Sequence, residues 1–390
     1  MPTTTHIDQV LRQAADAKEV PGVVAAAVND KGAIYEGAFG KRDLGKGDAM
    51  TVDSVFWIAS MTKAITATAA MQLVERGKLT LDDPVGKLLP QIAASQVLDG
   101  FDAAGKAKLR PAKRPITLRQ LLTHTAGFTY DLWNADMGKY MQQAGIPGII
   151  TCQNAALTTP LVFDPGERWD YGINIDWAGK AVEAASGQKL DAYLHDNIFA
   201  PLGMKDTGFK LGAGQRARLC GMHARTPDGL AAIPFELPQE PEFHMGGGGL
   251  YGTARDYLAF LQMLLHKGKH NGATLLKPET VAEMSKNNIG NLTAGVLKTA
   301  APDLSNDVDV FPGMAAKWGL SFLINPEKGP AGRSAGSLTW AGLANTYFWL
   351  DPVKRVAGVI LTQVLPFADA KVLSLYGHFE SGIYQVLEAA

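Results

Sequence analysis

The sequence predicts an α+β fold in which both ends of the chain contribute to one antiparallel sheet. The 390-residue chain has strand-like segments near both ends and mainly helical periodicity between them. It lacks the regular strand–helix alternation that builds a doubly wound parallel sheet. We therefore expect an α/β subdomain formed by residues 1–100 and 236–390. A mainly helical subdomain, residues 101–235, is expected to be inserted into it, with the functional site between the two.

The N-terminal elements follow from local patterns. Residues 7–18 are periodic as a helix, and residues 22–41 are typical of a hairpin whose turn is Asn29-Asp30-Lys31-Gly32. Residues 60–76 have apolar side chains at helical spacing, and Gly77 supplies a C-terminal stop. The sequence thus predicts helix, hairpin and long helix in that order.

The remaining elements change from helices to strands towards the C-terminus. Helical periodicity is expected in 118–125, 175–185, 192–198, 256–266 and 278–284. Strands are expected at 317–324, 337–341, 346–350 and 355–364, followed by a closing helix over 371–387. The C-terminal strands and the N-terminal hairpin would form the sheet, and the terminal helices would cover it.

Composition excludes several classes of function. The formal net charge is −1, with 46% hydrophobic and 19% charged residues, so no nucleic-acid partner is expected. The N-terminus lacks a signal-peptide pattern, and no stretch reaches the roughly 18 apolar residues of a membrane span. A cytoplasmic location without membrane partners is the default expectation. Cys152 and Cys220 are too few for a disulfide framework and are expected to be buried thiols.

Ser60-Met61-Thr62-Lys63 is the stretch that best indicates chemistry. It lies where the strand-like run 55–58 gives way to a helix, so the lysine projects from the same helical face as the serine. A serine hydroxyl needs such a neighbouring base to act as a nucleophile. The alternative is a helix-capping serine with a solvated lysine. A second copy, Ser186-Gly187-Gln188-Lys189, is interrupted by a helix-stopping glycine.

A rival nucleophile is Ser334 in Gly332-Arg333-Ser334-Ala335-Gly336, which matches the G-x-S-x-G elbow of α/β-hydrolases. Asp351 or Asp369 with His378 would nominally complete a triad. An elbow, however, requires a buried strand before the serine, and Pro326-Glu327-Lys328-Gly329-Pro330 stands there. Too few residues follow for the strands and helices that carry the acid and the histidine. We disfavour this interpretation.

Other formal motifs lack their structural context. Gly247-x-Gly249-x-x-Gly252 resembles a dinucleotide fingerprint and Gly100–Lys106 resembles a phosphate loop, but no strand precedes either. The glycine run is better explained by close backbone packing. His266 and His270 have an interrupting glycine and no acidic partner, so no metal site is expected.

Tyr171 is a further candidate for proton transfer. It follows the turn 164–170 and precedes a helix, a setting that can hold a side chain in a cleft. A lysine ammonium nearby would shift a tyrosine towards phenolate, which can accept a proton from a serine. A packed aromatic side chain is the alternative.

Taken in order, Ser60-Met61-Thr62-Lys63, Tyr171 and Trp340-Ala341-Gly342 resemble the serine hydrolases of the class C β-lactamase and penicillin-binding type. Within that group the chain looks most like the β-lactamase-like carboxylesterases of esterase family VIII. Supporting stretches cover nearly the whole chain: 116–128, 201–204 and 247–257. The resemblance implies a β-lactamase-like fold.

The resemblance also implies residue roles. Ser60 would be acylated, and Lys63 and Tyr171 would together transfer the proton. Either Lys63 or Tyr171 would be the base in the resting enzyme. The backbone N–H groups of Ser60 and Leu343 would hold the oxyanion, and Trp340, Ala341 and Gly342 would bind substrate. His124 belongs to a family-typical stretch without a catalytic role, so we expect it to be structural.

Two departures from the β-lactamase pattern decide the expected substrate. Trp340 stands where the family has a lysine that binds a substrate carboxylate. Ile173 stands where the family has an asparagine, and Asn174 is displaced by one position, which on a helix turns it away from the cleft. Both changes favour uncharged esters over β-lactams. An apolar pocket would be lined by Phe128, Tyr130, Trp133, Trp169 and Phe243.

The sequence therefore predicts a carboxylesterase that hydrolyses short-chain esters through an acyl-serine, without metal or cofactor. Its partner would be a small-molecule ester. The alternatives on the same fold are a β-lactamase, an amide hydrolase or an acyltransferase. An α/β-hydrolase using Ser334 and a non-catalytic penicillin-binding-like module are less favoured. Neither the oligomeric state nor the physiological substrate follows from the sequence.

Overall fold

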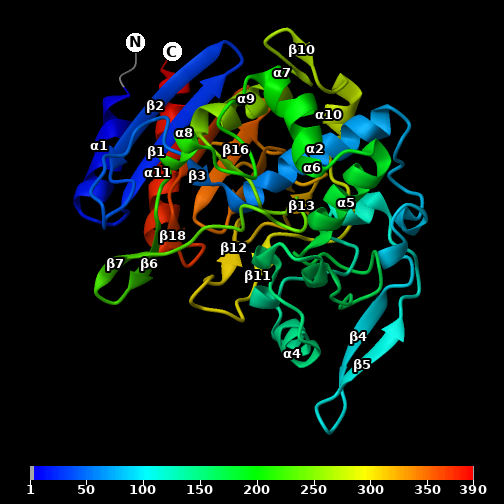
Figure 1. Cartoon of the computed structure of the whole chain (residues 1–390). Helices are drawn as coiled ribbons and strands as arrows, with labels where there is room; N and C mark the ends of the chain where they lie inside the picture. The colour runs from blue at the N-terminus through cyan, green and yellow to red at the C-terminus, as the bar shows by residue number, and fades with distance from the viewer. Residues whose placement is uncertain (1–3, 390) are drawn as a thin grey trace.

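A seven-stranded antiparallel sheet joins the two ends of the chain in the computed structural model, which describes residues 4–389 (Figure 1). N-terminal β1 pairs with C-terminal β17, with Val24 opposite Leu361, which confirms the predicted sheet. The strand order is β13-β14-β15-β16-β17-β1-β2. The bounds are β1 (Gly22–Asn29), β2 (Gly32–Gly40), β13 (Lys317–Trp318), β14 (Leu323–Ile324), β15 (Leu338–Gly342), β16 (Thr346–Asp351) and β17 (Val356–Leu361).

Helices cover both faces of this sheet. Neighbouring residues of a strand point to opposite faces, and on β16 Phe348 contacts Tyr257 of α9 while Trp349 contacts Phe379 of α11. The N-terminal helix α1 packs beside α11. The bounds are α1 (Thr5–Asp16), α9 (Ala254–Leu265), α10 (Pro278–Ser285) and α11 (Ala370–Glu388). The terminal helices therefore cover the sheet as predicted.

Helix α2 (Thr62–Glu75) is the buried centre of the molecule. Every residue from Thr62 to Leu73 is buried, so the helix has no solvated face along this stretch. A helix that is enclosed on all sides belongs to the core rather than to the surface. It packs against α5 (Asn174–Ser186). Side chains in its first turn are consequently held by contacts from several directions.

Helices outweigh strands in the region 101–235, but most of its residues belong to neither, and strands that were not predicted occur within it and at its start. The hairpin of β4 (Gln96–Phe101) and β5 (Ala107–Pro111) projects from the body (Figure 1). Only Val97 and Leu98 of its residues are buried, so the hairpin lacks the apolar alternation that signals a strand. A second hairpin joins β6 (Met222–Thr226) to β7 (Gly229–Ile233). The helices are α3 (Leu118–Leu122), α4 (Ala135–Ala144), α6 (Leu190–Leu194), α7 (Ala200–Leu202) and α8 (Ala213–Arg216).

Several predicted elements are shorter or divided in the structure. The helix expected over 118–125 ends at Leu122, and His124 adopts a left-handed backbone with φ 58°. The strand expected over 317–324 is a hairpin, because Ser321 at φ 71° reverses the chain. The strand expected over 355–364 ends at Leu361. Short remaining strands are β3 (Phe56–Trp57), β8 (Tyr251–Gly252), β9 (Lys269–His270), β10 (Ala273–Thr274), β11 (Val296–Leu297), β12 (Val308–Asp309) and β18 (Val364–Leu365).

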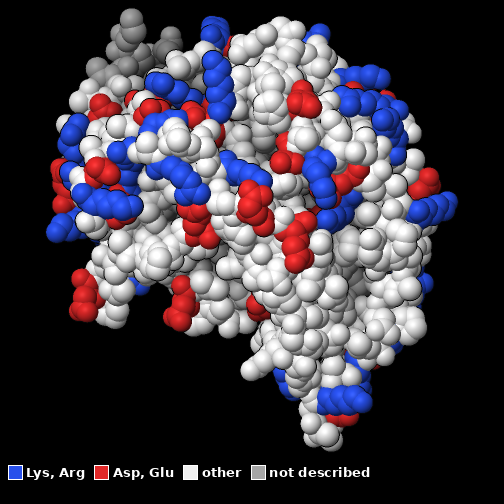
Figure 2. All heavy atoms as spheres, viewed as in Figure 1, with Lys and Arg blue, Asp and Glu red and all other residues white. Residues whose placement is uncertain are grey.

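The surface seen in Figure 2 carries charges of both signs, and both thiols are buried. In the view of Figure 2, basic and acidic side chains are mixed, and neither forms a separate patch. None of the helices within residues 4–389 is long and apolar enough to cross a membrane. Cys152 and Cys220 are both free and buried, as predicted.

Candidate active site

Ser60 is presented by a strained turn between β3 and α2. Ala59, the residue before it, has φ 44°, a left-handed conformation that is costly for a residue with a Cβ. A single 3₁₀ turn, Ala59–Met61, then leads into α2. Ala59 and Met61 are buried, whereas Ser60 keeps partial exposure. The backbone strain therefore lies at the position where a nucleophile must reach a substrate.

Lys63, in the first turn of α2, is fully buried beside Ser60. Its Nζ lies 3.1 Å from Ser60 Oγ, 3.0 Å from the Tyr130 hydroxyl and 2.6 Å from the Gly247 carbonyl oxygen. Removal from water disfavours the ammonium, so burial lowers the pKa of Lys63. The amine thus has a greater share of its neutral, proton-accepting form near neutral pH than an exposed lysine has.

A buried carboxylate, that of Asp176, lies close enough to this lysine to affect its pKa. Asp176 is in the first turn of α5, and its Oδ1 accepts the Gly247 N–H at 2.9 Å. Burial raises the pKa of Asp176, while the nearby Lys63 charge acts in the opposite direction. Its charge in turn opposes the lowering of the Lys63 pKa. Asp176 is not predicted from the sequence, because an acidic residue in a first helical turn is ordinary in any helix.

The glycine run Gly246–Gly249 encloses the lysine from the other side. Besides Gly247, two of its carbonyls accept hydrogen bonds, from Thr66 Oγ1 at 2.8 Å and from Trp57 Nε1 at 2.7 Å. A Cβ on Gly247 would come within 2.6 Å of an Asp176 carboxylate oxygen. Glycine is required here for close approach of the backbone, as predicted, and not for cradling a phosphate.

Tyr171 lies next to the Ser60–Lys63 pair and is 2% exposed. Its hydroxyl accepts the Trp340 Nε1–H at 2.8 Å, and Lys63 Nζ lies 4.7 Å from the centre of its ring. Burial raises the pKa of Tyr171, although hydrogen bonds from Ser60 and Trp340 oppose the shift. The expectation of a shift towards phenolate is therefore corrected, because desolvation outweighs these bonds.

The β15 strand brings Trp340 and the residues after it to the nucleophile. A side chain on Gly342 would collide with the Ile58 carbonyl oxygen, two residues before Ser60. Ala341 and Gly342 are buried, and Leu343 follows directly and is half-buried. This contact places the Leu343 backbone beside the turn that carries Ser60. The oxyanion role of the two N–H groups stays a prediction.

Aromatic rings surround Tyr171. Three of the five residues predicted to line a pocket are here, and Trp318, which was not predicted, joins them. The ring centres nearest to that of Tyr171 belong to His124 at 4.6 Å, Trp340 at 4.9 Å, Tyr130 at 5.4 Å, Trp133 at 5.5 Å, Trp169 at 6.2 Å and Trp318 at 6.4 Å. These contacts fix the ring and make this wall of the site largely apolar.

The other two predicted pocket residues pack elsewhere. Phe128 stacks against Trp177 with 6.3 Å between ring centres, and Phe243 lies 5.2 Å from the Lys180 ammonium. Tyr130, predicted only as lining, instead makes the direct contact with Lys63 described above. Sequence spacing could not separate these residues, because all of them are aromatic positions outside the predicted helices and strands.

His124 and Asn174 contact each other through their side chains, and the His124 ring packs against that of Tyr171. Asn174 Nδ2 lies 3.0 Å from His124 Nδ1 and donates to the Phe128 carbonyl oxygen at 3.2 Å. Burial lowers the pKa of His124, and therefore the ring is neutral. Asn174 thus binds the Phe128 backbone and His124, and it makes no hydrogen bond to Lys63 among residues 4–389.

The rival motifs do not form sites. Ser334 lies in an irregular segment before β15, and its backbone N–H donates to Asp351 Oδ2 at 2.8 Å. Within residues 4–389 no histidine hydrogen-bonds to Ser334, and no cluster of three metal-binding side chains occurs. His266 and His270 stack against each other, with ring centres 6.1 Å apart.

The geometry is that of a serine acyl-transfer site of the β-lactamase fold, and the comparisons agree. The beta-lactamase family model matches residues 7–377, so the chain belongs to the beta-lactamase family. It is an enzyme of the serine hydrolase and acyltransferase type within that fold.

Individual relatives align over almost their whole length. Monacolin J acid methylbutanoyltransferase of Aspergillus terreus is 34% identical, with 97% of this chain and 95% of the relative covered. Lovastatin esterase of Penicillium rubens is 31% identical, with 98% and 99% covered. The structure of simvastatin synthase from Aspergillus terreus superposes with a TM-score of 0.85 at 32% identity, covering 98% of each chain.

Proposed function

We propose that this enzyme transfers an acyl group from an ester to an alcohol through an acyl-serine on Ser60, with water as a competing acceptor. The observation that carries the proposal is the hydrogen-bond distance of 3.1 Å between Ser60 Oγ and the buried Lys63 amine. Such a base activates a serine hydroxyl at neutral pH. The sequence predicts hydrolysis first and acyl transfer second, whereas the relatives favour the reverse order.

The first half-reaction uses neutral Lys63 as the base. The amine accepts the Ser60 proton while Oγ forms a bond to the ester carbonyl carbon, and the oxyanion faces the predicted N–H groups of Ser60 and Leu343. The carbon–oxygen bond of the leaving alcohol then breaks. That alcohol departs with the proton held by Lys63, and the acyl group remains on Ser60.

Tyr171 would act in its protonated form. Its oxygen already accepts a hydrogen bond from Trp340 Nε1, so the phenol proton is available to point towards the Ser60 side. A neutral phenol there can pass a proton to the leaving oxygen and recover it from Lys63. In the second half-reaction the acceptor hydroxyl gives its proton to Lys63 as it attacks the acyl carbon. The bond between the acyl carbon and Ser60 Oγ then breaks, and Oγ recovers the proton from Lys63.

The aromatic wall supports an organic alcohol as acceptor. Trp340 offers apolar area and a single N–H where a β-lactamase has a cation, so the site has no group there for a substrate carboxylate. Rings around Tyr171 stabilise an apolar alcohol by contact, which water cannot match. The name of the first relative describes an acyltransferase, which supports this assignment by similarity.

The test is a partition experiment with vinyl butyrate as donor and benzyl alcohol as acceptor in buffer. We expect benzyl butyrate to form in excess of free butyrate once benzyl alcohol reaches millimolar concentration, measured by chromatography of both products. Ser60→Ala should form neither. Butyrate alone, unchanged by benzyl alcohol, would contradict acyl transfer.

Ester hydrolysis is the second candidate, and it has a specific observation in its favour. Lovastatin esterase is 31% identical across nearly the full length of both chains. An acyl-serine is common to both reactions, so only the acceptor differs. Hydrolysis is also the activity that the resemblance to family VIII carboxylesterases implies. Efficient turnover of nitrocefin would instead indicate a β-lactamase and contradict both candidates.

A further inference from the structure

Three oxygen atoms surround the buried Lys63 amine, and none of them belongs to a carboxylate. They are Ser60 Oγ at 3.1 Å, the Tyr130 hydroxyl oxygen at 3.0 Å and the Gly247 carbonyl oxygen at 2.6 Å. Asp176 affects the amine through its charge, but within residues 4–389 it makes neither a hydrogen bond nor an ion pair with Lys63. The direct partners of the amine are therefore neutral groups.

These three oxygens match the three N–H groups of a lysine ammonium. Lys63 becomes an ammonium when it accepts the Ser60 proton, and each of its N–H groups then has one acceptor. Next to these acceptors lie the rings of Tyr130 and Tyr171, whose centres are 5.2 and 4.7 Å from the amine. Loss of the Tyr130 oxygen would leave one N–H of a buried cation without a protein acceptor, which is costly.

Tyr130 provides this acceptor without adding a charge. The residue is 7% exposed, and burial raises the pKa of Tyr130 well above its ordinary value, so the hydroxyl stays a neutral phenol. A carboxylate at the same distance would hold Lys63 as an ammonium and prevent it from accepting a proton. A neutral oxygen stabilises the ammonium as it forms and still leaves the resting amine free to act as a base.

Three other titratable side chains lie near Lys63. Burial raises the pKa of Asp176 on α5 and that of Tyr171, and it lowers the pKa of His124. None of the three accepts a hydrogen bond from Lys63 Nζ within the described residues. Removal of the Tyr130 hydroxyl therefore changes the direct partners of the amine and leaves these neighbouring groups in place.

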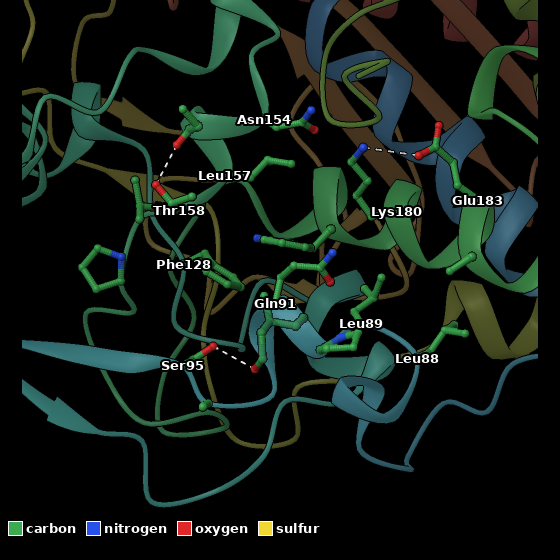
Figure 3. A pocket seen from close by; sticks show the side chains of 18 of the residues that line it. Leu88, Leu89, Gln91, Ser95, Phe128, Asn154, Leu157, Thr158, Lys180 and Glu183 are labelled. Carbon is green, nitrogen blue, oxygen red and sulfur yellow. Dashed lines mark hydrogen bonds and ion pairs between the residues drawn. The ribbon is translucent and has the colours of Figure 1, made fainter. Parts of the chain in front are cut away.

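Contacts that do not involve the hydroxyl fix the position of Tyr130. Its backbone N–H donates to the Tyr171 carbonyl oxygen at 3.2 Å, and its ring centre lies 5.9 Å from that of Trp133. Two positions earlier, Phe128 lines a separate cavity of about 1060 Å³, to which Lys63 does not contribute (Figure 3). A change of Tyr130 to phenylalanine keeps all of these contacts and removes only the oxygen.

We propose that Tyr130 is a positioning residue of the acyl-transfer reaction, and that its hydroxyl oxygen accepts the third N–H of the Lys63 ammonium. The inference rests on the acyl-serine chemistry proposed above for Ser60. In that step the proton moves from Ser60 Oγ to Lys63 Nζ while Oγ bonds to the ester carbonyl carbon, and Tyr130 keeps its own proton. Tyr130 thereby makes Lys63 a stronger base than it would be with two acceptors.

The test is the rate at which a fluorophosphonate labels Ser60, measured over about pH 5 to 9 by intact-protein mass spectrometry. Without the third acceptor the ammonium is less stable, so Lys63 is a weaker base in Tyr130→Phe. We expect the acidic limb of the profile to move about one pH unit lower and the plateau rate to fall about three- to tenfold. The two profiles should converge at low pH, where the larger share of neutral amine offsets the weaker base.

Tyr140→Phe is the control for the loss of a tyrosine hydroxyl. Tyr140 lines the cavity shown in Figure 3 and not the catalytic site, so the profile of this variant should match that of the unmodified protein. Tyr130→Leu also lacks the oxygen and should move the acidic limb in the same direction, which provides a second measurement should Tyr130→Phe fold poorly.

The shape of the profile decides the outcome. An equal fall in rate at every pH, with the acidic limb unmoved, would mean that Tyr130 acts only through packing and would overturn the proposal. So would an unchanged profile or a limb moved to higher pH. Absence of any label on Ser60 of the unmodified protein is a distinct result, because it would overturn the acyl-serine function together with this inference.

Discussion

Two serine–lysine pairs with the same spacing occur in this chain, and their surroundings differ in every respect that matters for reactivity. Lys63 is fully buried, and its amine is within hydrogen-bond distance of Ser60. Ser186 is the last residue of α5, and Gly187 at φ 74° ends the helix. Lys189 is exposed, and the Ser186 hydroxyl accepts the Gln188 N–H at 3.2 Å.

The difference between the pairs shows that spacing alone does not create a nucleophile. In the first pair the helix continues through the lysine, so both side chains share a face. Burial then makes the lysine a base at neutral pH. In the second pair the left-handed glycine breaks the helix, and the lysine is exposed to water. Helix continuity and desolvation are therefore the two conditions that can be tested.

Removal of each serine in turn should give the largest difference. We expect Ser60→Ala to lower kcat/KM for an activated ester by at least about 10⁴-fold, because it removes the atom that carries the acyl group. Ser186→Ala should leave the rate within about twofold, since that serine has no base beside it. Rates of p-nitrophenyl butyrate turnover measure both.

Covalent labelling provides an independent check on the same residue. A fluorophosphonate should add one label to the unmodified protein and to Ser334→Ala, but none to Ser60→Ala, as read by intact-protein mass spectrometry. A label mapped to Ser334 or Ser186 would show that the nucleophile has been assigned to the wrong serine.

Removal of the two lysines should give the next largest difference. Lys63→Met should lower kcat by about 10²–10⁴-fold, since it removes the proton acceptor while keeping an unbranched side chain. Lys189→Met should change kcat by less than about twofold. Circular dichroism must show that both variants are folded. Equal loss in the two variants would argue that charge, and not the buried position, supports the reaction.

The pH dependence tests desolvation directly. Burial lowers the pKa of Lys63, so the amine loses its proton at a pH well below the ordinary lysine value of about 10.4. Activity needs the neutral amine, and kcat/KM should therefore fall about tenfold per pH unit below the folded-state pKa. Asp176→Asn removes the charge that favours the ammonium and should move this limb to lower pH. A shift to higher pH would contradict the assignment.

The smallest effect is expected at Trp340. Trp340→Phe removes the N–H that donates to Tyr171 and keeps most of the ring, so kcat should fall about three- to tenfold. Trp169→Phe is the matched control, because its ring contacts Tyr171 but its Nε1 has no protein partner among the described residues. Equal effects of the two changes on kcat would mean that ring packing, not the hydrogen bond, supports Tyr171.

Local sequence patterns were sufficient for the sheet and its covering helices. The N-terminal hairpin, the strands after residue 337 and the terminal helices each have a periodicity that is readable within about ten residues. The β4–β5 hairpin was missed because its exposed residues lack alternation. The early end of α3 was missed because nothing in the sequence requires His124 to adopt a left-handed backbone.

The site residues also fall into two groups. Some could be predicted from sequence motifs, and others depend on contacts that only the folded chain makes. Ser60, Lys63, Tyr171 and Trp340 could be placed together because their order resembles a known family. Asp176 and the hydrogen bond from Lys63 to Tyr130 depend on how α2, α5 and an irregular segment pack, which no local pattern encodes. The raised pKa of Tyr171 likewise follows from burial that only the folded chain provides.

The contact of Gly342 with Ile58 bears on how the enzyme is made. Thr346 Oγ1 also donates to the Ile58 carbonyl at 3.4 Å, across 288 positions of sequence. The turn bearing Ser60 therefore acquires these two neighbours only after the C-terminal strands have been synthesised and paired. A chain still emerging from the ribosome therefore contains the nucleophile and Lys63 but lacks the C-terminal part of the site.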